Sequence, residues 1–369
     1  MSELSLVDAV WLRHLLPSLS FRLGLGAGPD RIGLPAAQRY VVVLVDGLGW
    51  DIILPELAHA PYLAGIVGDS QRAATGLPST TAASLTSLWT GLPPGLTGIV
   101  GFTFDLDGRG TSAKYPDVIA PLYLRQPLDL PTSWPDRLVE AGVAVTWVIP
   151  PDQVKSAFTA MGTRRARLVG LEPTAEAERI EAIVQASRSG ERSLTYVYDG
   201  RVDHTGHGQG VASRAWRAEL ARVDRFLGDL RDGLPDDVRL IVTGDHGMID
   251  VAPTDKVVIE DNPALARDLR LVAGEARCRF LYTAKPAAVA SRWADQLGDQ
   301  AWVLTRAEAI GQGVFGQVDP AYASRIGDVV VLARAGQAYL SHRFPAEFKL
   351  IGFHGAGTPA ERYVPIAVD

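Results

Sequence analysis

Residues 40–47 read Tyr-Val-Val-Val-Leu-Val-Asp-Gly, and this stretch decides the fold class. Its first six residues form an unbroken apolar run rich in β-branched side chains. Such a run is typical of a strand buried on both faces of a largely parallel sheet. The run ends at Asp46-Gly47, so a carboxylate directly follows the strand. Ligands gather at the carboxyl ends of strands in such sheets, which makes Asp46 a candidate binding residue.

The same pattern recurs along the chain. Further short apolar runs occupy residues 143–149, 194–198 and 238–242, and each follows a helical pattern. Within 216–230, apolar residues return every three or four positions, as in an amphipathic helix packed on a sheet. Strands that alternate with helices predict an α/β fold: a doubly wound, largely parallel sheet with helices on both faces.

The chain of 369 residues is long enough for one large core with an insertion. Residues 257–340 carry strand and helix patterns of their own, between the last two groups of candidate ligands. We therefore expect a catalytic core formed by residues 1–256 and 341–369, and a small capping insertion formed by residues 257–340.

Composition limits the function classes. Cys278 is the single cysteine, which excludes an intramolecular disulfide and favours a reducing compartment, so we expect a cytoplasmic protein. The first residues lack the pattern of a signal peptide, and no apolar run reaches the ~20 residues of a membrane helix. A net charge of -6 without a basic run argues against binding to a nucleic-acid scaffold. A small phosphorylated substrate remains compatible with this charge.

Carboxylates and imidazoles gather in four short islands: Asp46-Gly47, Asp203-His-Thr-Gly-His207, Asp245-His246-Gly247 and His354-Gly355. Because three of these islands follow predicted strands, we expect them to converge on one edge of the sheet. Mixed carboxylate and imidazole sets suit zinc, and also manganese. Asp203 and His207, four residues apart, can share one ion that His354 completes. Asp245 and His246 can hold a second ion with Asp46.

A candidate nucleophile lies between the first two islands. Pro78-Ser79-Thr80-Thr81 leads into a helical stretch, so the Thr81 hydroxyl is expected near a helix N-terminus, where N–H groups favour an anion. Two divalent ions roughly 4 Å apart can clamp a phosphoryl group, and a metal can lower the pKa of the threonine hydroxyl. The alternative is that a hydroxyl in this stretch is only a helix cap, for which Ser79 and Thr80 are candidates.

In this order, the motifs resemble the alkaline phosphatase superfamily, and within it the nucleotide pyrophosphatase/phosphodiesterase-like branch. The resemblance spans about residues 40–355 and includes Thr90-Gly-Leu-Pro-Pro94 and Asp245-His-Gly-Met248. It implies a phosphodiesterase or nucleotide pyrophosphatase with two divalent ions, usually zinc, and a phospho- or nucleotidyl-threonine intermediate that water hydrolyses. The implied nucleophile is Thr81. The implied ligands are Asp46, Asp245 and His246 for the ion that activates it, and Asp203, His207 and His354 for the other ion.

The sequence departs from that branch at one position. Its well-known members place an asparagine shortly after His-Gly-Ile-Val-Gly to hold a phosphoryl oxygen, whereas this chain has Phe102. A phosphomonoesterase or phosphonate hydrolase on the same site is therefore an alternative. A phosphotransferase or mutase, or an inactive metal-binding homologue, is a further alternative. The sulfatases of the superfamily need Cys-x-Pro-x-Arg, which the sequence at Cys278 does not match.

Overall fold

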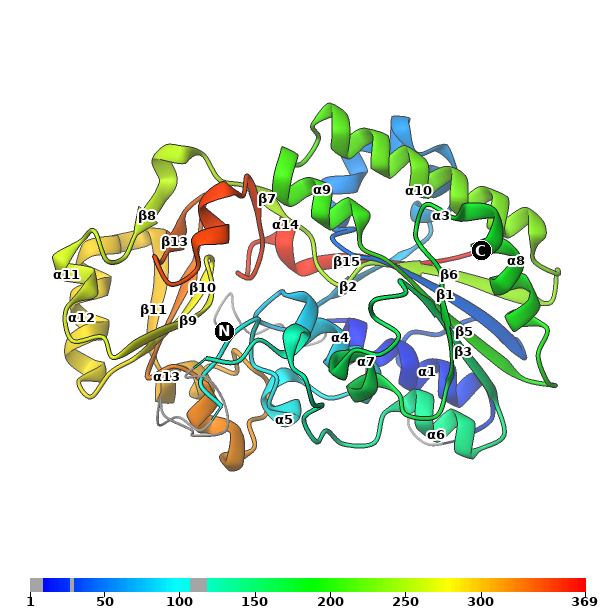
Figure 1. Ribbon diagram of the computed structural model, residues 1–369, viewed down its shortest axis with the longest axis horizontal. Helices are drawn as coiled ribbons and strands as arrows, with labels where there is room; N and C mark the ends of the chain where they lie inside the picture. Colours follow the sequence, from blue (N-terminus) through cyan, green and yellow to red (C-terminus); the bar gives the residue numbers. More distant parts are fainter. Residues whose placement is uncertain (1–8, 27–29, 107–117) are drawn as a thin grey trace.

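The structure is a computed structural model that describes residues 9–26, 30–106 and 118–369. Residues 1–8, on which the expected lack of a signal peptide partly rests, lie outside this range. A seven-stranded sheet in the order β2-β15-β6-β1-β5-β3-β4 forms the centre of the larger part of the molecule (Figure 1). Its strands are β1 (Arg39–Val45), β2 (Gln71–Ala74), β3 (Ala144–Ile149), β4 (Arg167–Gly170), β5 (Ser193–Asp199), β6 (Val238–Thr243) and β15 (Tyr363–Val368).

Strand β1 is the centre of the parallel part of the sheet, between β5 and β6. Its side chains alternate between two buried clusters: Val41, Val43 and Val45 lie in one, and Val42 and Leu44 in the other. Both faces are therefore covered, which explains why the strand reads as a continuous apolar run.

Helices cover the two faces of this sheet (Figure 1). The face that carries Val42 packs against one set: α1 (Leu15–Arg22), α4 (Thr81–Thr90), α6 (Trp134–Glu140) and α7 (Ala157–Gly162). The opposite face packs against another set: α3 (Pro61–Val67), α8 (Glu176–Ser187) and α10 (Arg214–Gly233). The arrangement confirms the predicted fold class. Helix α10 includes the predicted helix 216–230, and the Ser213 hydroxyl caps it by accepting the N–H of Trp216.

A second sheet lies at one end of the molecule, in the order β11-β12-β10-β9 (Figure 1). Its antiparallel strands are β9 (Leu271–Glu275), β10 (Cys278–Tyr282), β11 (Ala301–Thr305) and β12 (Val329–Ala333). Its helices are α11 (Pro263–Ala266), α12 (Pro286–Leu297) and α13 (Arg306–Gly311). Strands β8 (Lys256–Val258) and β13 (Ala338–Leu340) pair, so the two ends of the segment 257–340 lie side by side. The division into core and capping insertion stays a prediction.

Two further features complete the fold. Strand β15, near the carboxyl end, enters the main sheet antiparallel to β6 and β2, so the sheet is largely but not wholly parallel. The Pro/Gly-rich stretch 91–101 contains the short helix α5 (Pro94–Thr97). Among the described helices, none combines the length and the apolar character needed to cross a bilayer.

Candidate metal centre

The carboxyl ends of β1, β5 and β6 bring three carboxylates together. Asp46 directly follows β1, Asp245 follows β6 after one residue, and Asp203 lies in the first turn of α9 (Arg201–Gln209), just beyond β5. Because β1 pairs with both β5 and β6, the three side chains meet at one edge of the sheet. The expected convergence of these islands is therefore observed.

A glycine makes this meeting possible. Gly47 has a φ of +75°, and a Cβ at this position would lie 3.0 Å from Cα of Asp203. The Gly47 N–H donates to Oδ1 of Asp245 at 3.2 Å, and the Asp203 N–H donates to the carbonyl of Asp46 at 3.1 Å. The turn after β1 is thus hydrogen-bonded to the segments that carry Asp203 and Asp245. A side chain at position 47 would push Asp203 away from this turn.

Asp46, Asp245 and His246 form what we call the inner group, and their exposed fractions are 3%, 0% and 0%. Nε2 of His246 lies 3.3 Å from Oδ1 of Asp46 and 3.6 Å from Oδ2 of Asp245. One ligand atom from each residue lies within 4.8 Å of the others. This spacing allows all three to bind a single ion.

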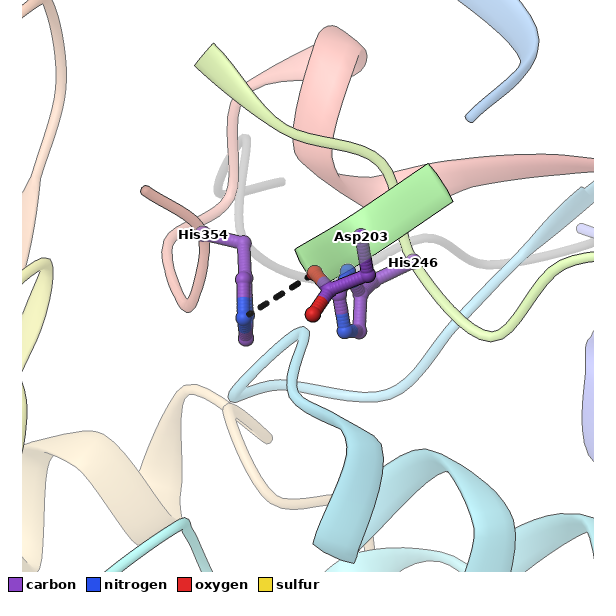
Figure 2. A group of neighbouring side chains, drawn as sticks. All are labelled: Asp203, His246 and His354. Carbon is purple, nitrogen blue, oxygen red and sulfur yellow. Dashed lines mark ion pairs between the residues drawn. The ribbon is translucent and has the colours of Figure 1, made fainter. Parts of the chain in front are cut away.

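Asp203, His207 and His354 form what we call the outer group, although the close cluster of ligand atoms on this side comprises Asp203, His246 and His354 and does not include His207. Nε2 of His207 lies 3.4 Å from Oδ1 of Asp203, and Nε2 of His354 lies 3.9 Å from the same oxygen. His354 follows the short strand β14 (Gly352–Phe353), which pairs with β7 (Ile249–Asp250). Figure 2 shows that His246 approaches Asp203 and His354, and the imidazoles of His246 and His354 stack at 3.7 Å between centroids. The two groups are therefore adjacent parts of one site.

The three imidazoles are oriented in the same way. Each Nδ1 lies next to a backbone carbonyl: Gly247 for His246 at 3.0 Å, Gly352 for His207 at 2.8 Å, and Ser79 for His354 at 2.9 Å. A carbonyl only accepts, so Nδ1 carries the hydrogen and Nε2 keeps its lone pair. All three Nε2 atoms are thus prepared to bind a metal, in the arrangement usual for ligating histidines.

The electrostatics of the site also favour a bound cation. Burial raises the pKa of Asp46 well above its usual value, and the neighbouring Asp245 and Asp203 raise it further. Burial, with the charge of Asp203, raises the pKa of Asp245 to about 7. Burial lowers the pKa of His354 well below its usual value, and the two other imidazoles lower it further. Three close carboxylates repel one another, and a positive ion would relieve this repulsion.

Unpartnered carboxylate oxygens provide a direct test of fit. Oδ1 of Asp46, Oδ1 of Asp203 and Oδ2 of Asp245 are buried without a hydrogen-bond partner among the described residues. Each is also the oxygen that faces an imidazole Nε2. A buried carboxylate oxygen is costly unless it is paired or binds a metal. The inner and outer groups therefore fit divalent cations.

Thr81 belongs to the inner group by its contacts. It is the first residue of α4, and Thr80 is the N-cap residue, although the Thr80 side chain makes no capping hydrogen bond. Oγ1 of Thr81 lies 3.5 Å from Oδ2 of Asp46 and 3.2 Å from Nε2 of His246. Ser79 is engaged elsewhere, since its hydroxyl donates to the carbonyl of Ala356. Thr81 thus offers the aliphatic hydroxyl that reaches the candidate ligands Asp46 and His246.

Phe102 lies near the site but cannot replace the family asparagine. Its side chain has no donor, and its backbone N–H donates to Oε2 of Glu275 at 2.9 Å. Neither the side chain nor the backbone N–H of Phe102 is therefore available to donate to a phosphoryl oxygen. The N–H groups in the first turn of α4, which have no partner within the helix, remain next to Thr81.

One further contact and one cavity-lining residue are visible only in three dimensions. The Tyr198 hydroxyl donates to Oδ2 of Asp46, the oxygen that also lies near Thr81. His204, inside the second island, is exposed and lines the adjoining cavity, but it does not belong to the close ligand groups. Alternation along β5 gives the only sequence signal for Tyr198, because residue 198 points to the same face as residue 196.

Comparisons with known proteins agree with this geometry. A profile of the type I phosphodiesterase / nucleotide pyrophosphatase family matches residues 40–356. Ectonucleotide pyrophosphatase/phosphodiesterase family member 7 from Mus musculus, and the same protein from Rattus norvegicus, are each 42% identical to this chain over 64 residues. These alignments cover 16% of this chain and only 15% of each relative.

Solved structures share the fold over most of the chain. Murine ectonucleotide pyrophosphatase / phosphodiesterase 5 has a TM-score of 0.67 and 19% identity, with coverage of 89% of this chain and 88% of that chain. An inactive form of the murine protein in complex with AMP has a TM-score of 0.66 and 18% identity, with coverage of 89% and 87%. Phosphonoacetate hydrolase from Sinorhizobium meliloti 1021, in complex with phosphonoformate, has a TM-score of 0.66 and 19% identity, with coverage of 90% of both chains.

These similarities confirm both the fold and the resemblance that the ordered motifs indicated. The matched profile begins at the first residue of the apolar run in β1 and ends just after His354, so it includes every candidate ligand. The chain therefore belongs to the type I phosphodiesterase / nucleotide pyrophosphatase family, whose members are hydrolases.

Proposed function

We propose that this chain is a metal-dependent phosphodiesterase or nucleotide pyrophosphatase that acts on small phosphate diesters. One observation carries the proposal: the Thr81 hydroxyl lies 3.2 Å from Nε2 of His246 and 3.5 Å from Oδ2 of Asp46. A threonine hydroxyl inside a set of carboxylate and imidazole ligands is the arrangement expected of a metal-activated nucleophile.

The inner group, together with Thr81, would hold one divalent cation, and the outer group would hold the other. The donor types suit zinc, and manganese is the alternative. When bound, the cations lower the pKa of the Thr81 hydroxyl and offset the negative charge of the phosphoryl group and the leaving oxygen. The fixed Nδ1 hydrogens of the three histidines support this assignment, because they leave each Nε2 available.

In the proposed reaction, Oγ1 of Thr81 attacks phosphorus and releases its proton, and the bond between phosphorus and the leaving oxygen breaks. Oδ2 of Asp46, at 3.5 Å, is an acceptor within reach of that proton. Water then cleaves the phosphothreonine and restores the hydroxyl. One diester and one water give one monoester and one alcohol, or two phosphates in the case of a pyrophosphate substrate. The N–H groups at the start of α4 are the donors available to the phosphoryl oxygens, since Phe102 offers none.

The test compares bis-p-nitrophenyl phosphate with p-nitrophenyl phosphate, each assayed with added zinc or manganese. The proposal expects a higher kcat/KM for the diester. A strong preference for the monoester would identify a phosphomonoesterase instead. Lack of turnover of either compound would favour an inactive homologue. Products are also measured with an added acceptor alcohol, because transfer to the alcohol without hydrolysis would indicate a phosphotransferase.

A nucleotide substrate is part of the proposal. The murine relative, bound to AMP in its inactive form, shares the fold over 89% of this chain. The site also opens into a cavity of about 850 Å³, large enough for a nucleotide. Turnover of a dinucleoside polyphosphate, with the nucleoside monophosphate as a product, is the corresponding measurement.

A phosphonate hydrolase is the second candidate, and Phe102 is the observation that favours it. At this position the chain departs from the phosphodiesterase members of the family, which carry an asparagine there. The phosphonoacetate hydrolase of similar fold makes phosphonoacetate the natural probe. Release of phosphate and acetate at a higher kcat/KM than diester hydrolysis would support this candidate over the first. The cytoplasmic location stays a prediction under either function.

A further inference from the structure

The loop that carries His354 continues directly into a short helix. Residues 354–358 follow β14 and lead into α14 (Pro359–Arg362), and β15 of the main sheet comes next. Helix α14 lies between the second sheet and the main sheet (Figure 1). Its residue Glu361 is 0% exposed, and a carboxylate buried to this extent is costly unless it is paired and hydrogen-bonded. The partners of Glu361 therefore show what this helix holds in place.

Glu361 is hydrogen-bonded to two loops, and each of them carries a candidate metal ligand. Its Oε1 accepts the N–H of Ala356, two residues after His354, at 3.0 Å. Its backbone carbonyl accepts the N–H of Gly247, the residue after His246, at 2.8 Å. One buried residue thus contacts both the loop of an outer ligand and the loop of an inner ligand.

A further pair of contacts extends this restraint to the imidazole of His354. The carbonyl of Ala356 accepts the Ser79 hydroxyl at 2.7 Å, and the carbonyl of Ser79 accepts the Nδ1–H of His354 at 2.9 Å. Glu361, Ala356, Ser79 and His354 therefore form a continuous series of contacts. The series ends at the hydrogen bond that orients the ring and leaves Nε2 available for a metal.

Both ligand loops pack closely against their surroundings. A Cβ at Gly247 would lie 1.9 Å from the carbonyl oxygen of Ala360 in α14. A Cβ at Gly355 would lie 2.4 Å from Cγ of Glu275, at the end of β9. Only glycine fits such positions. Because no space separates these segments, a shift of α14 or of the second sheet would move the backbone next to both histidines.

The charge of Glu361 is matched by an arginine from the segment 257–340. Arg277 lies in the turn between β9 and β10 and is also 0% exposed. Its Nε donates to Oε1 of Glu361 at 2.7 Å and its Nη2 donates to Oε2 at 2.9 Å, which is a bidentate pair. Its Nη1 donates to the carbonyls of Ala335 and Gln337, between β12 and β13. The second sheet thus fixes the guanidinium, and the guanidinium holds the carboxylate in one orientation.

We infer that Arg277 and Glu361 are positioning residues of the metal centre. Arg277 fixes the carboxylate of Glu361. Glu361 in turn holds the two loops that present His354 and His246 to the cations. The segment 257–340 thereby takes part in metal binding, although it contributes none of the candidate ligands. The inference rests on the proposed function only for the identity of these ligands.

Zinc affinity, measured by competition with a chromogenic chelator, tests the inference without any need for turnover. Arg277→Lys keeps the positive charge but loses the two parallel hydrogen bonds to Glu361. Glu361→Asp keeps the negative charge but is too short to reach Arg277 and the Ala356 N–H together. Because both variants keep the buried charges balanced, we expect each to fold and to bind zinc at the outer group more weakly than the parent, by about tenfold or more.

The matched control is Arg279→Lys. Arg279 is also 0% exposed and donates to a carboxylate, that of Glu347, but this pair makes no hydrogen bond to either ligand loop among the described contacts. In excess chelator, Arg279→Lys and Arg277→Lys should lower the midpoint of urea unfolding by similar amounts. Only Arg277→Lys should also weaken zinc binding.

Two results would overturn the inference. The first is a loss of stability with unchanged zinc affinity in both Arg277→Lys and Glu361→Asp, because the pair would then support only the fold. The second is an equal loss of zinc affinity in Arg279→Lys. A parent chain that binds no divalent cation would overturn the metal centre together with this inference. If the parent binds zinc but does not hydrolyse diesters, the proposed reaction is wrong, and the comparison of affinities still decides the inference.

Discussion

The inner and outer groups use the same ligand types in opposite proportions. The inner group has two carboxylates and one imidazole, all at most 3% exposed. The outer group has one carboxylate and two imidazoles, whose side chains are 15% exposed for Asp203, 23% for His207 and 11% for His354. More negative charge in a drier environment should hold a cation more firmly. We therefore expect the inner ion to exchange slowly and the outer ion to exchange more readily.

The two groups also differ in how the chain builds them. The inner ligands follow the adjacent strands β1 and β6, whose pairing fixes them directly. The outer group needs contacts between distant segments: the His207 carbonyl accepts the N–H of Ile351, and Ser79 accepts the Nδ1–H of His354. Small shifts of these segments should therefore disturb the outer group first. The predictions that follow begin with the largest expected effect and end with the smallest.

The largest effect is expected at the hydroxyl that joins the inner group to the substrate. Thr81→Ala should reduce turnover of bis-p-nitrophenyl phosphate by about a thousandfold or more, because no other described hydroxyl contacts both Asp46 and His246. Metal content, measured by elemental analysis, should stay close to that of the parent, since the carboxylate and imidazole ligands remain.

The matched control is Thr80→Ala. Thr80 is adjacent and buried, but its side chain makes no capping hydrogen bond. We expect it to retain most of its activity. Near-normal turnover by Thr81→Ala would remove Thr81 as the nucleophile, whatever the metal content.

Removal of metal should reveal the difference between the groups as a difference in stability. With a chelator present, Asp245→Asn should raise the free energy of unfolding by about 2 kcal/mol, because it removes one of three close buried charges. Asparagine Oδ1 can still accept from the N–H groups of Gly47 and His246. Asp203→Asn, at the more exposed group, should raise it less.

With zinc present, both substitutions should lower the stability, because each removes a ligand of an ion that binds only the folded state. Urea unfolding with and without the chelator provides the four comparisons. Equal changes for the two variants in the chelator would show that burial does not distinguish the groups.

Residues whose role follows from a local sequence pattern could be predicted. Residues whose role depends on contacts between distant segments could not. The run 40–45 identifies β1 because a strand buried on both faces needs no alternation, and Asp46 follows from the place of ligands in parallel sheets. His207 is four residues from Asp203 on one helix, so local spacing again carries the information.

The cluster of contacting aromatic rings formed by Trp89, Trp147, Phe158 and Tyr196 had no comparable signal. Trp147, Phe158 and Tyr196 come from three separate elements, and each reads as ordinary core in its own segment. The contact between Phe102 and Glu275 joins residues 173 positions apart, so no local pattern contains it. Strand β15 was missed for the same reason, since only its pairing with β6 and β2 gives it a place in the sheet.

The buried carboxyl group of Glu275 lies near the outer group but belongs to neither candidate ligand group. Burial raises the pKa of Glu275 to about 8, although the Phe102 N–H partly opposes this. A carboxyl with a folded pKa above its unfolded value contributes stability that is full below about pH 4.5 and is lost as pH rises through about 8. Glu275→Gln should therefore be more stable than the parent at pH 8.5, by on the order of 3 kcal/mol, and similar to it at pH 4.5.

Urea unfolding at the two pH values measures this. Glu181→Gln, on the exposed side of α8, is the control and should change stability little at either pH. A parent that gains stability relative to Glu275→Gln as pH rises would contradict the prediction.

The smallest effect concerns the orientation of an inner ligand. The Tyr198 hydroxyl donates to Oδ2 of Asp46, and no residue of the outer group has a comparable tyrosine partner among the described contacts. Tyr198→Phe keeps the ring but leaves Asp46 free to rotate, so kcat for the diester should fall roughly tenfold. Zinc affinity should also weaken at the slowly exchanging inner site, as followed by competition with a chromogenic chelator. Because an effect on packing alone would lower stability without changing this affinity, weaker binding at the inner site is the result that assigns Tyr198 to the orientation of Asp46.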